Sequence, residues 1–259
     1  MGNVRNLKVG VPGQQVDFSL AFDENTFMAS PRVWLGYGFS NGTSIRGRWW
    51  QFDHALQAEH NEHHLGVAGA DVLRWEGTGR LRLYTVDVDV VQQLETRIVE
   101  ANVGVGIRFA GIEHNRDLNV TIPHIVDIKR IGGHSFEGLG PCVSAEIYRS
   151  ILNTNARAFI ASRGSLLIGR RENSCVLDAD IPVLAEYLQD LTAVDASLSR
   201  DAQVFASELR LGAEWFKDLS GRARFFVRGS WDTQFWAGSG VGLFGISLMG
   251  GSIGMGIAR

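Results

Sequence analysis

Apolar and polar residues alternate over long stretches of the chain, most clearly between residues 98 and 110. Val103, Val105 and Ile107 alternate there with glycines and polar residues such as Arg108. Successive side chains of a β-strand point to opposite faces of its sheet. The pattern therefore predicts a strand with one apolar face and one polar face.

The same alternation recurs along the chain and predicts ten strands. They cover residues 15–22, 32–39, 43–54, 84–92, 98–110, 135–149, 156–171, 202–216, 222–236 and 242–258. The connections after the second, fourth, sixth and eighth strands are short, whereas those after the third, fifth and seventh are long. Up-and-down barrels of bacterial outer membranes show this arrangement, with short periplasmic turns and long outer loops. The expected fold is a single all-β domain over residues 1–259, an antiparallel transmembrane β-barrel of about ten strands, with eight or twelve as alternatives.

The connections carry their own signals. The long loops are expected over residues 55–79, 112–133 and 172–200, and residues 1–14 are expected to form an N-terminal extension. Asn41-Gly42 predicts a tight hairpin turn because both residue types tolerate positive φ, although Asn41-Gly42-Thr43 also fits a glycosylation acceptor. Four apolar residues of the last loop have helical spacing and indicate a short helix: Ile181, Leu184, Leu188 and Leu191.

Alternation alone does not determine which face of the sheet contacts water. A soluble ligand-binding barrel would bury its apolar face, whereas a membrane barrel turns it toward lipid. Seven of the ten predicted strands are 12 to 17 residues long and exceed the 9 to 11 needed to cross a bilayer. Aromatic residues collect near strand ends, and arginine dominates the polar face. These features favour the membrane barrel, with the soluble barrel as the alternative.

The membrane reading assigns each face to named residues. The predicted lumen lining is Arg46, Arg48, Asp87, Asp89, Glu100, Arg108, Glu146, Arg157, Arg163, Glu208, Arg210, Glu214, Arg224, Arg228 and Asp232. The predicted lipid-facing residues are Val99, Val103, Val105, Ile107, Phe225, Val227 and Trp231. About ten strands enclose little space, so the lumen is either a narrow charged passage for small solutes or ions, or a closed ion-pair core.

Composition narrows the functional classes. A formal net charge of -3 gives no reason to expect a nucleic-acid partner, and the chain has no apolar run long enough for a transmembrane helix. The expected partner is the lipid bilayer of a bacterial outer membrane, with any export signal removed or truncated from this chain. Cys142 and Cys175 are more simply two separate thiols than a bridge. No cofactor, resident metal or catalytic residue is expected.

Two groups of residues suggest chemistry less strongly. Histidines and glutamates crowd the first long loop, namely His54, Glu59, His60, Glu62, His63 and His64. They could bind zinc, but their spacing does not match the two-histidine helix motif, and a solvated loop is the simpler interpretation. His124, Asp127 and His134 lie in or beside the second loop, which leaves an outer-membrane hydrolase as a third possibility.

Three glycine-rich segments resemble the wall of a known family. They are Phe136-Glu137-Gly138-Leu139-Gly140-Pro141, Ala161-Ser162-Arg163-Gly164-Ser165-Leu166-Leu167-Ile168-Gly169 and Leu211-Gly212-Ala213-Glu214-Trp215. The chain is similar in these segments to the Legionella major outer membrane protein family of pore-forming barrels, which is abundant in planctomycete-type genomes. The resemblance runs from about Pro31 to the end of the chain. It implies an outer-membrane barrel of porin-like or structural function without catalytic residues.

Overall fold

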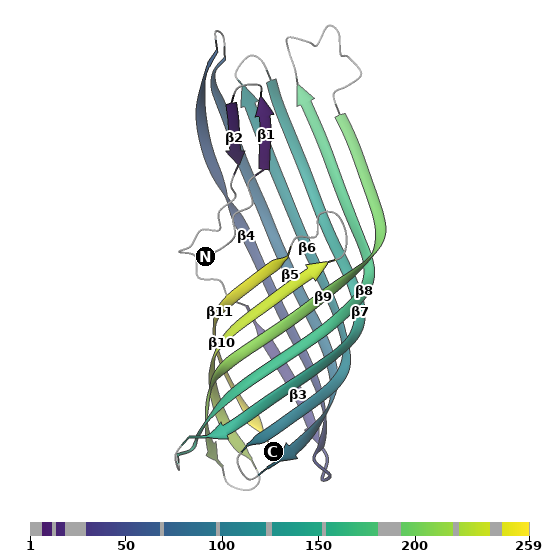
Figure 1. The fold of residues 1–259 in the computed structure, drawn as a ribbon, viewed down its shortest axis with the longest axis vertical. Coiled ribbons are helices and arrows are strands. Elements are labelled where there is room, and N and C mark those ends of the chain that lie inside the picture. The colour runs from purple at the N-terminus through teal and green to yellow at the C-terminus, as the bar shows by residue number, and fades with distance from the viewer. Residues whose placement is uncertain are drawn as a thin grey trace.

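The computed structural model describes residues 7–11, 14–18, 30–67, 70–96, 99–122, 126–151, 154–180, 193–219, 223–238 and 245–258. Nine antiparallel strands form one sheet in which sequence neighbours are always spatial neighbours, and the sheet curls into a half-barrel (Figure 1). Its strands are β3 (Arg32–Gly38), β4 (Thr43–Val67), β5 (Ala70–Glu95), β6 (Glu100–Ile122), β7 (Val126–Ser150), β8 (Ala156–Asp180), β9 (Ala193–Asp218), β10 (Arg224–Gly238) and β11 (Ile246–Ala258). The predicted all-β, up-and-down architecture is confirmed. Within the described ranges no helix is long and apolar enough to cross a membrane.

The strands are longer than their alternation predicts. β4 to β9 contain 23 to 26 residues each, so the described parts of the loops expected at 55–79 and 112–133, and much of 172–200, are continuations of strands. The loop prediction was wrong because it took loss of the apolar face as loss of the strand. Backbone hydrogen bonds make the ladder, and β5 pairs β6 without interruption from Arg74↔Thr121 to Glu95↔Glu100. The helix expected from Ile181 to Leu191 lies outside the described residues.

The first predicted strand does not join this sheet. Gln14–Phe18 forms β2, which pairs with β1 (Leu7–Val11) in a separate two-stranded sheet, and residues 19–22 lie outside the described ranges. Alternation identifies a strand but does not identify its partner. The nine-stranded sheet therefore has β3 and β11 as its edges, and these two strands run in the same direction. Side chains meet across the seam, where the Trp34 ring stacks on Phe226 with centroids 6.1 Å apart.

Motif glycines bring neighbouring backbones close together. A Cβ at Gly140 would lie 1.8 Å from the carbonyl oxygen of Leu166, and one at Gly169 would lie 1.9 Å from that of Glu137. Both distances are impossible for real atoms, so these positions of β7 and β8 admit only glycine without backbone movement. Glycine at these two positions of the wall segments thus has a local steric cause.

The hairpin turn at Gly42 and the two separate thiols agree with the sequence predictions. Gly42 has φ of 78°, and the Asn41 side-chain oxygen accepts a hydrogen bond from the Thr43 amide at 3.1 Å, as a hairpin turn requires. Cys142 and Cys175 are both free. Cys175 lies opposite Gly132, about 33 Å along β7 from Cys142, so the two thiols are far beyond bridging distance.

Candidate functional site

The convex face of the sheet is apolar over a band of nearly constant height. On β6, Val103, Val105 and Ile107 are 46%, 61% and 57% exposed, and Trp231 on β10 is 57% exposed. The other three residues predicted to meet lipid are less exposed. Phe225 and Val227 of β10 are half-buried, and Val99 lies just before β6 and is half-buried too.

The height of this band is close to that of a bilayer core. On β6 it runs from Ala101 to Gly111, where Glu113 ends it, and on β7 it runs from Ile147 to Leu139, where Glu137 ends it. The ten steps on β6 rise about 33 Å and the eight on β7 about 26 Å, which become about 25 and 20 Å at the tilt usual in barrels. Tyr84 marks the upper limit, where its hydroxyl donates to Glu137 at 2.6 Å.

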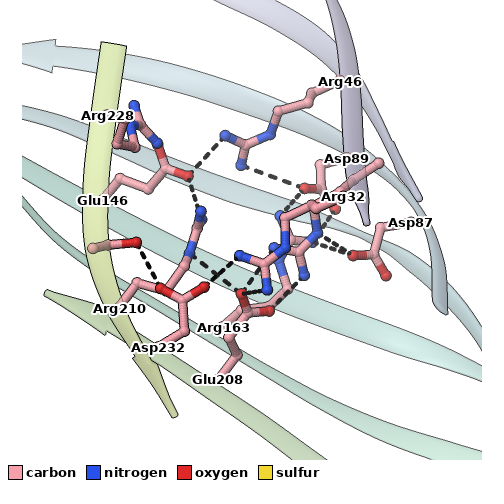
Figure 2. Close-up of polar contacts among 12 residues, drawn as sticks. Arg32, Arg46, Asp87, Asp89, Glu146, Arg163, Glu208, Arg210, Arg228 and Asp232 are labelled. Carbon is pink, nitrogen blue, oxygen red and sulfur yellow. Dashed lines mark hydrogen bonds and ion pairs between the residues drawn. The ribbon is translucent and has the colours of Figure 1, made fainter. Parts of the chain in front are cut away.

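The concave face carries a network of ion pairs at the same height. Arg48 binds Asp87 at 2.9 Å and Glu208 at 2.7 Å, so it bridges β4 to β5 and to the distant β9. Figure 2 shows both of these carboxylates among the arginines of the network. Arg108 also binds Asp87, at 2.7 Å. Arg163 binds Asp89 through both terminal nitrogens. These charges are almost fully buried, and Asp87 is 0% exposed.

The network extends across the interior to the far side. Arg46 binds Glu146 at 2.9 Å, and Arg210 lies 3.5 Å from Glu146 and 3.3 Å from Glu208. Arg32 of β3 reaches Glu208 at 3.1 Å, and its other terminal nitrogen lies 3.0 Å from Asp232 of β10. The network holds six arginines (32, 46, 48, 108, 163 and 210) and five carboxylates (87, 89, 146, 208 and 232).

A second cluster lies nearer the short-turn end. Arg157 and Arg228 bind Glu214 at 2.7 and 2.6 Å, and Arg157 also reaches Glu100 at 2.7 Å. The Tyr148 hydroxyl joins the clusters, because it donates to Glu146 at 2.7 Å and accepts from Arg228 at 3.0 Å.

The structure thus brings fourteen of the fifteen predicted lumen residues into these two clusters. Arg224 lies apart and pairs with Asp218 at the ends of β9 and β10, where both are exposed. Sequence reasoning missed Arg32 and Tyr148, although Tyr148 shares the facing of Glu146 on β7 and Arg32 lies on the side of β3 opposite Val33 and Leu35. The alternation of side chains between the two faces of each strand was the available signal.

An apolar layer covers the ion pairs on the same concave face. Leu83, Leu167 and Phe136 are between 0% and 1% exposed and pack with Trp50 and Trp236. The remaining buried members are Phe52, Leu81, Ala110, Ile112, Ala202, Val204 and Ala206. The polar face of the sequence therefore lines only part of the interior, and higher up the same facing is filled with large apolar side chains. The gap lined by Ser144 and Arg163 below this layer has no room for a water molecule.

The weaker candidates do not form sites among the described residues. Asp127 and His134 both lie on β7, but their spacing puts them on opposite faces of the strand. His124 and the side chains of His60, His63 and His64 fall outside the described part. No group of three metal-ligating side chains is found among the described residues.

The fold and its two faces define a class of protein, an antiparallel curled β-sheet of barrel type with an apolar exterior and a charged, packed interior. No family model matches the chain, and no curated protein matches it. Among solved structures, the chain is similar at 9% identity and a TM-score of 0.23 to the siderophore receptor PiuA from Acinetobacter baumannii. That match covers 88% of this chain, which spans 44% of the receptor chain.

Proposed function

We propose that the protein is a bacterial outer-membrane β-barrel with a packed, non-conducting interior, and that its principal partner is the lipid bilayer. The observation that carries this proposal is the inversion of the two faces, since the same strands expose apolar side chains outward and bury charges inward. A soluble barrel shows the opposite arrangement. The apolar band, about 20 to 25 Å high, is close to the band of about 25 Å in outer-membrane barrels.

The packed interior supports a structural role over a pore. An isolated charge away from water costs several kcal/mol, so the clustered arginines and carboxylates are stable only because they pair. Moving a solute through this interior would break several pairs and displace Phe136, Leu83 and Leu167 above them. Both steps oppose conduction.

A porin-like passage for small solutes or ions is the second candidate. The buried Nε atoms of Arg32 and Arg46 have no hydrogen-bond partner. Unsatisfied donors inside a charged interior are the feature expected if water or an ion enters there in another state. This observation favours a gated passage rather than an open one.

Two experiments test the proposal. The membrane assignment predicts that the protein needs detergent for extraction and migrates faster on gels before heating than after it, and a protein that stays in the aqueous fraction contradicts it. The packed interior predicts silence in planar bilayers over a wide range of voltage and salt. Reproducible single-channel currents from the folded protein would replace the structural role with the porin-like one.

We also propose membership of the Legionella major outer membrane protein family. Support comes from the three wall segments and from the close backbone approach at Gly140 and Gly169 within two of them. A solved structure of a family member provides the test. Glycines at equivalent close approaches are expected there, and bulkier residues at those positions would contradict the assignment.

A further inference from the structure

Above the apolar layer, β6 to β9 continue as an open sheet whose concave face is basic. Arg171 of β8 lies directly opposite Arg200 of β9. One row higher, His114, His134 and Asn173 are cross-strand neighbours on β6, β7 and β8. Arginines directly opposite each other repel, so this pairing destabilises the sheet unless an anion offsets it.

Acidic residues of this region face the other way. By strand register the described carboxylates lie on the convex face, namely Glu113, Asp117, Asp127, Glu172, Asp178, Asp195 and Asp201. The concave face has Arg116, Arg130, Arg171 and Arg200, and no ion pair joins any of these four to another described residue. This separation of charge differs from the interior below, where every arginine of the network has a carboxylate partner.

Hydrogen bonds hold several of these cationic groups in place. Arg171 donates through Nε to the Asn173 side-chain oxygen at 2.9 Å, and Nδ1 of His134 lies 2.7 Å from the same oxygen. Because that oxygen only accepts, Nδ1 of His134 carries a proton. Arg116 donates to Nε2 of His114 at 3.0 Å, so His114 is neutral in this arrangement.

The surroundings of these groups disfavour additional positive charge. Burial, together with Arg116 and His134, lowers the pKa of His114 to about 4. Burial and the neighbouring Arg130 lower the pKa of Arg116. Arg171 is only 6% exposed, yet it has no carboxylate partner among the described residues. Such a group lacks the counter-charge that a buried cation normally has.

We propose that this concave basic face binds an oxyanion, the phosphate or carboxylate group of a small solute. Arg171 and Arg200, which lie directly opposite each other, are its principal ligands. Guanidinium groups match both oxyanions because each presents two parallel N–H donors. The site lies on the part of the sheet beyond the apolar band, so it requires neither a conducting interior nor a bilayer.

Titration calorimetry of the detergent-solubilised full chain tests this proposal, with inorganic phosphate and citrate as the probes. Losing a charge-assisted hydrogen bond costs about ten- to a hundredfold in affinity. Arg171→Gln and Arg200→Gln are expected to weaken binding of the better probe by at least about tenfold. Arg170→Gln is the matched control, because it removes the same charge from the residue just before Arg171 on β8, where Arg170 faces outward and bonds Ser199.

Three results would overturn the proposal. The first is that neither probe binds saturably, and the second is that Arg170→Gln lowers the affinity as much as the two test variants do. The third is that free phosphate no longer binds in nanodiscs that contain phosphatidylglycerol in place of phosphatidylcholine. The last would assign the face to a lipid headgroup. Arg200 is exposed, so Arg200→Gln tests the site even if Arg171→Gln fails to fold. Because binding is measured in detergent, its failure is distinguishable from failure of the membrane or conductance experiments.

Discussion

Replacing Asp87 with asparagine removes the carboxylate on which three strands converge. Asp87 is fully buried and lies 2.9 Å from Arg48, 2.7 Å from Arg108 and 3.4 Å from Arg163. The amide keeps the shape of the side chain but leaves three guanidinium groups with one negative charge fewer. Breaking a buried ion pair costs about 3–5 kcal/mol, because a desolvated charge loses its partner. We expect Asp87→Asn to lower the free energy of unfolding by that amount.

Urea unfolding in detergent, followed by tryptophan fluorescence, measures this change. Asp53→Asn is the matched control, since Asp53 forms an equally short pair with Arg80 at 2.7 Å on the exposed convex face. Exposed pairs contribute about 0–1 kcal/mol. Equal effects of the two substitutions, or an effect of Asp87→Asn below about 1 kcal/mol, would show that the interior network is hydrated and not a packed core.

The remaining predictions use neighbouring residues of β8 and one histidine. Leu167→Ala, in the apolar layer, should destabilise the protein by about 2–5 kcal/mol. Leu166→Ala on the convex face should destabilise it clearly less, because lipid or detergent refills the space. Similar losses of stability in urea unfolding would contradict the assigned faces. Gly169→Ala should lower the free energy of unfolding by about 1–3 kcal/mol, because its Cβ would meet backbone atoms. Gly164→Ala should be nearly neutral, since no atom lies within 4 Å of its Cβ. The reverse order of unfolding midpoints would contradict this steric explanation. His114 has a pKa lowered from 6.5 to about 4 in the fold, so the unfolded chain takes up the proton first. The contribution of neutral His114 to stability is complete above about pH 6.5, and about 1–3 kcal/mol of it is lost as the pH falls toward 4. A His114→Gln variant should lack that part of the pH dependence of urea unfolding.

The two faces could be predicted from sequence because parity is a strict rule. Once a strand is located, each alternate residue is assigned, and this is how Arg48, Asp87 and Glu208 reach one interior from three separate strands. Pairing between distant strands could not be predicted, because it depends on how far the sheet curls. Only coordinates show that Arg48 reaches β9.

The apolar layer and the strand extensions were missed for a related reason. Leu83 and Ile112 share the facing of Asp87 and Arg108, and that facing changes from charged to apolar within four residues along β5 and β6. A pattern read as one polar and one apolar face averages over such a change. Beyond the apolar band the convex face becomes polar, and the concave face mixes charged residues with apolar ones such as Leu118 and Val120. The alternation is less regular there than in the wall, even though the backbone ladder continues.

The seam between β3 and β11 follows from the strand number. Nine antiparallel strands leave both edges running in one direction, so antiparallel closure needs an even number, as in the expected barrel of about ten. Inside, the seam is already bridged by side chains, because Arg32 of β3 reaches Glu208 and Asp232 on the other side. In hydrocarbon, however, every backbone N–H and C=O of an edge needs a partner. The membrane assignment therefore requires hydrogen-bond partners for the edge backbones of β3 and β11, which the side-chain contacts inside do not supply. At this seam the proposed function depends most directly on closure of the sheet.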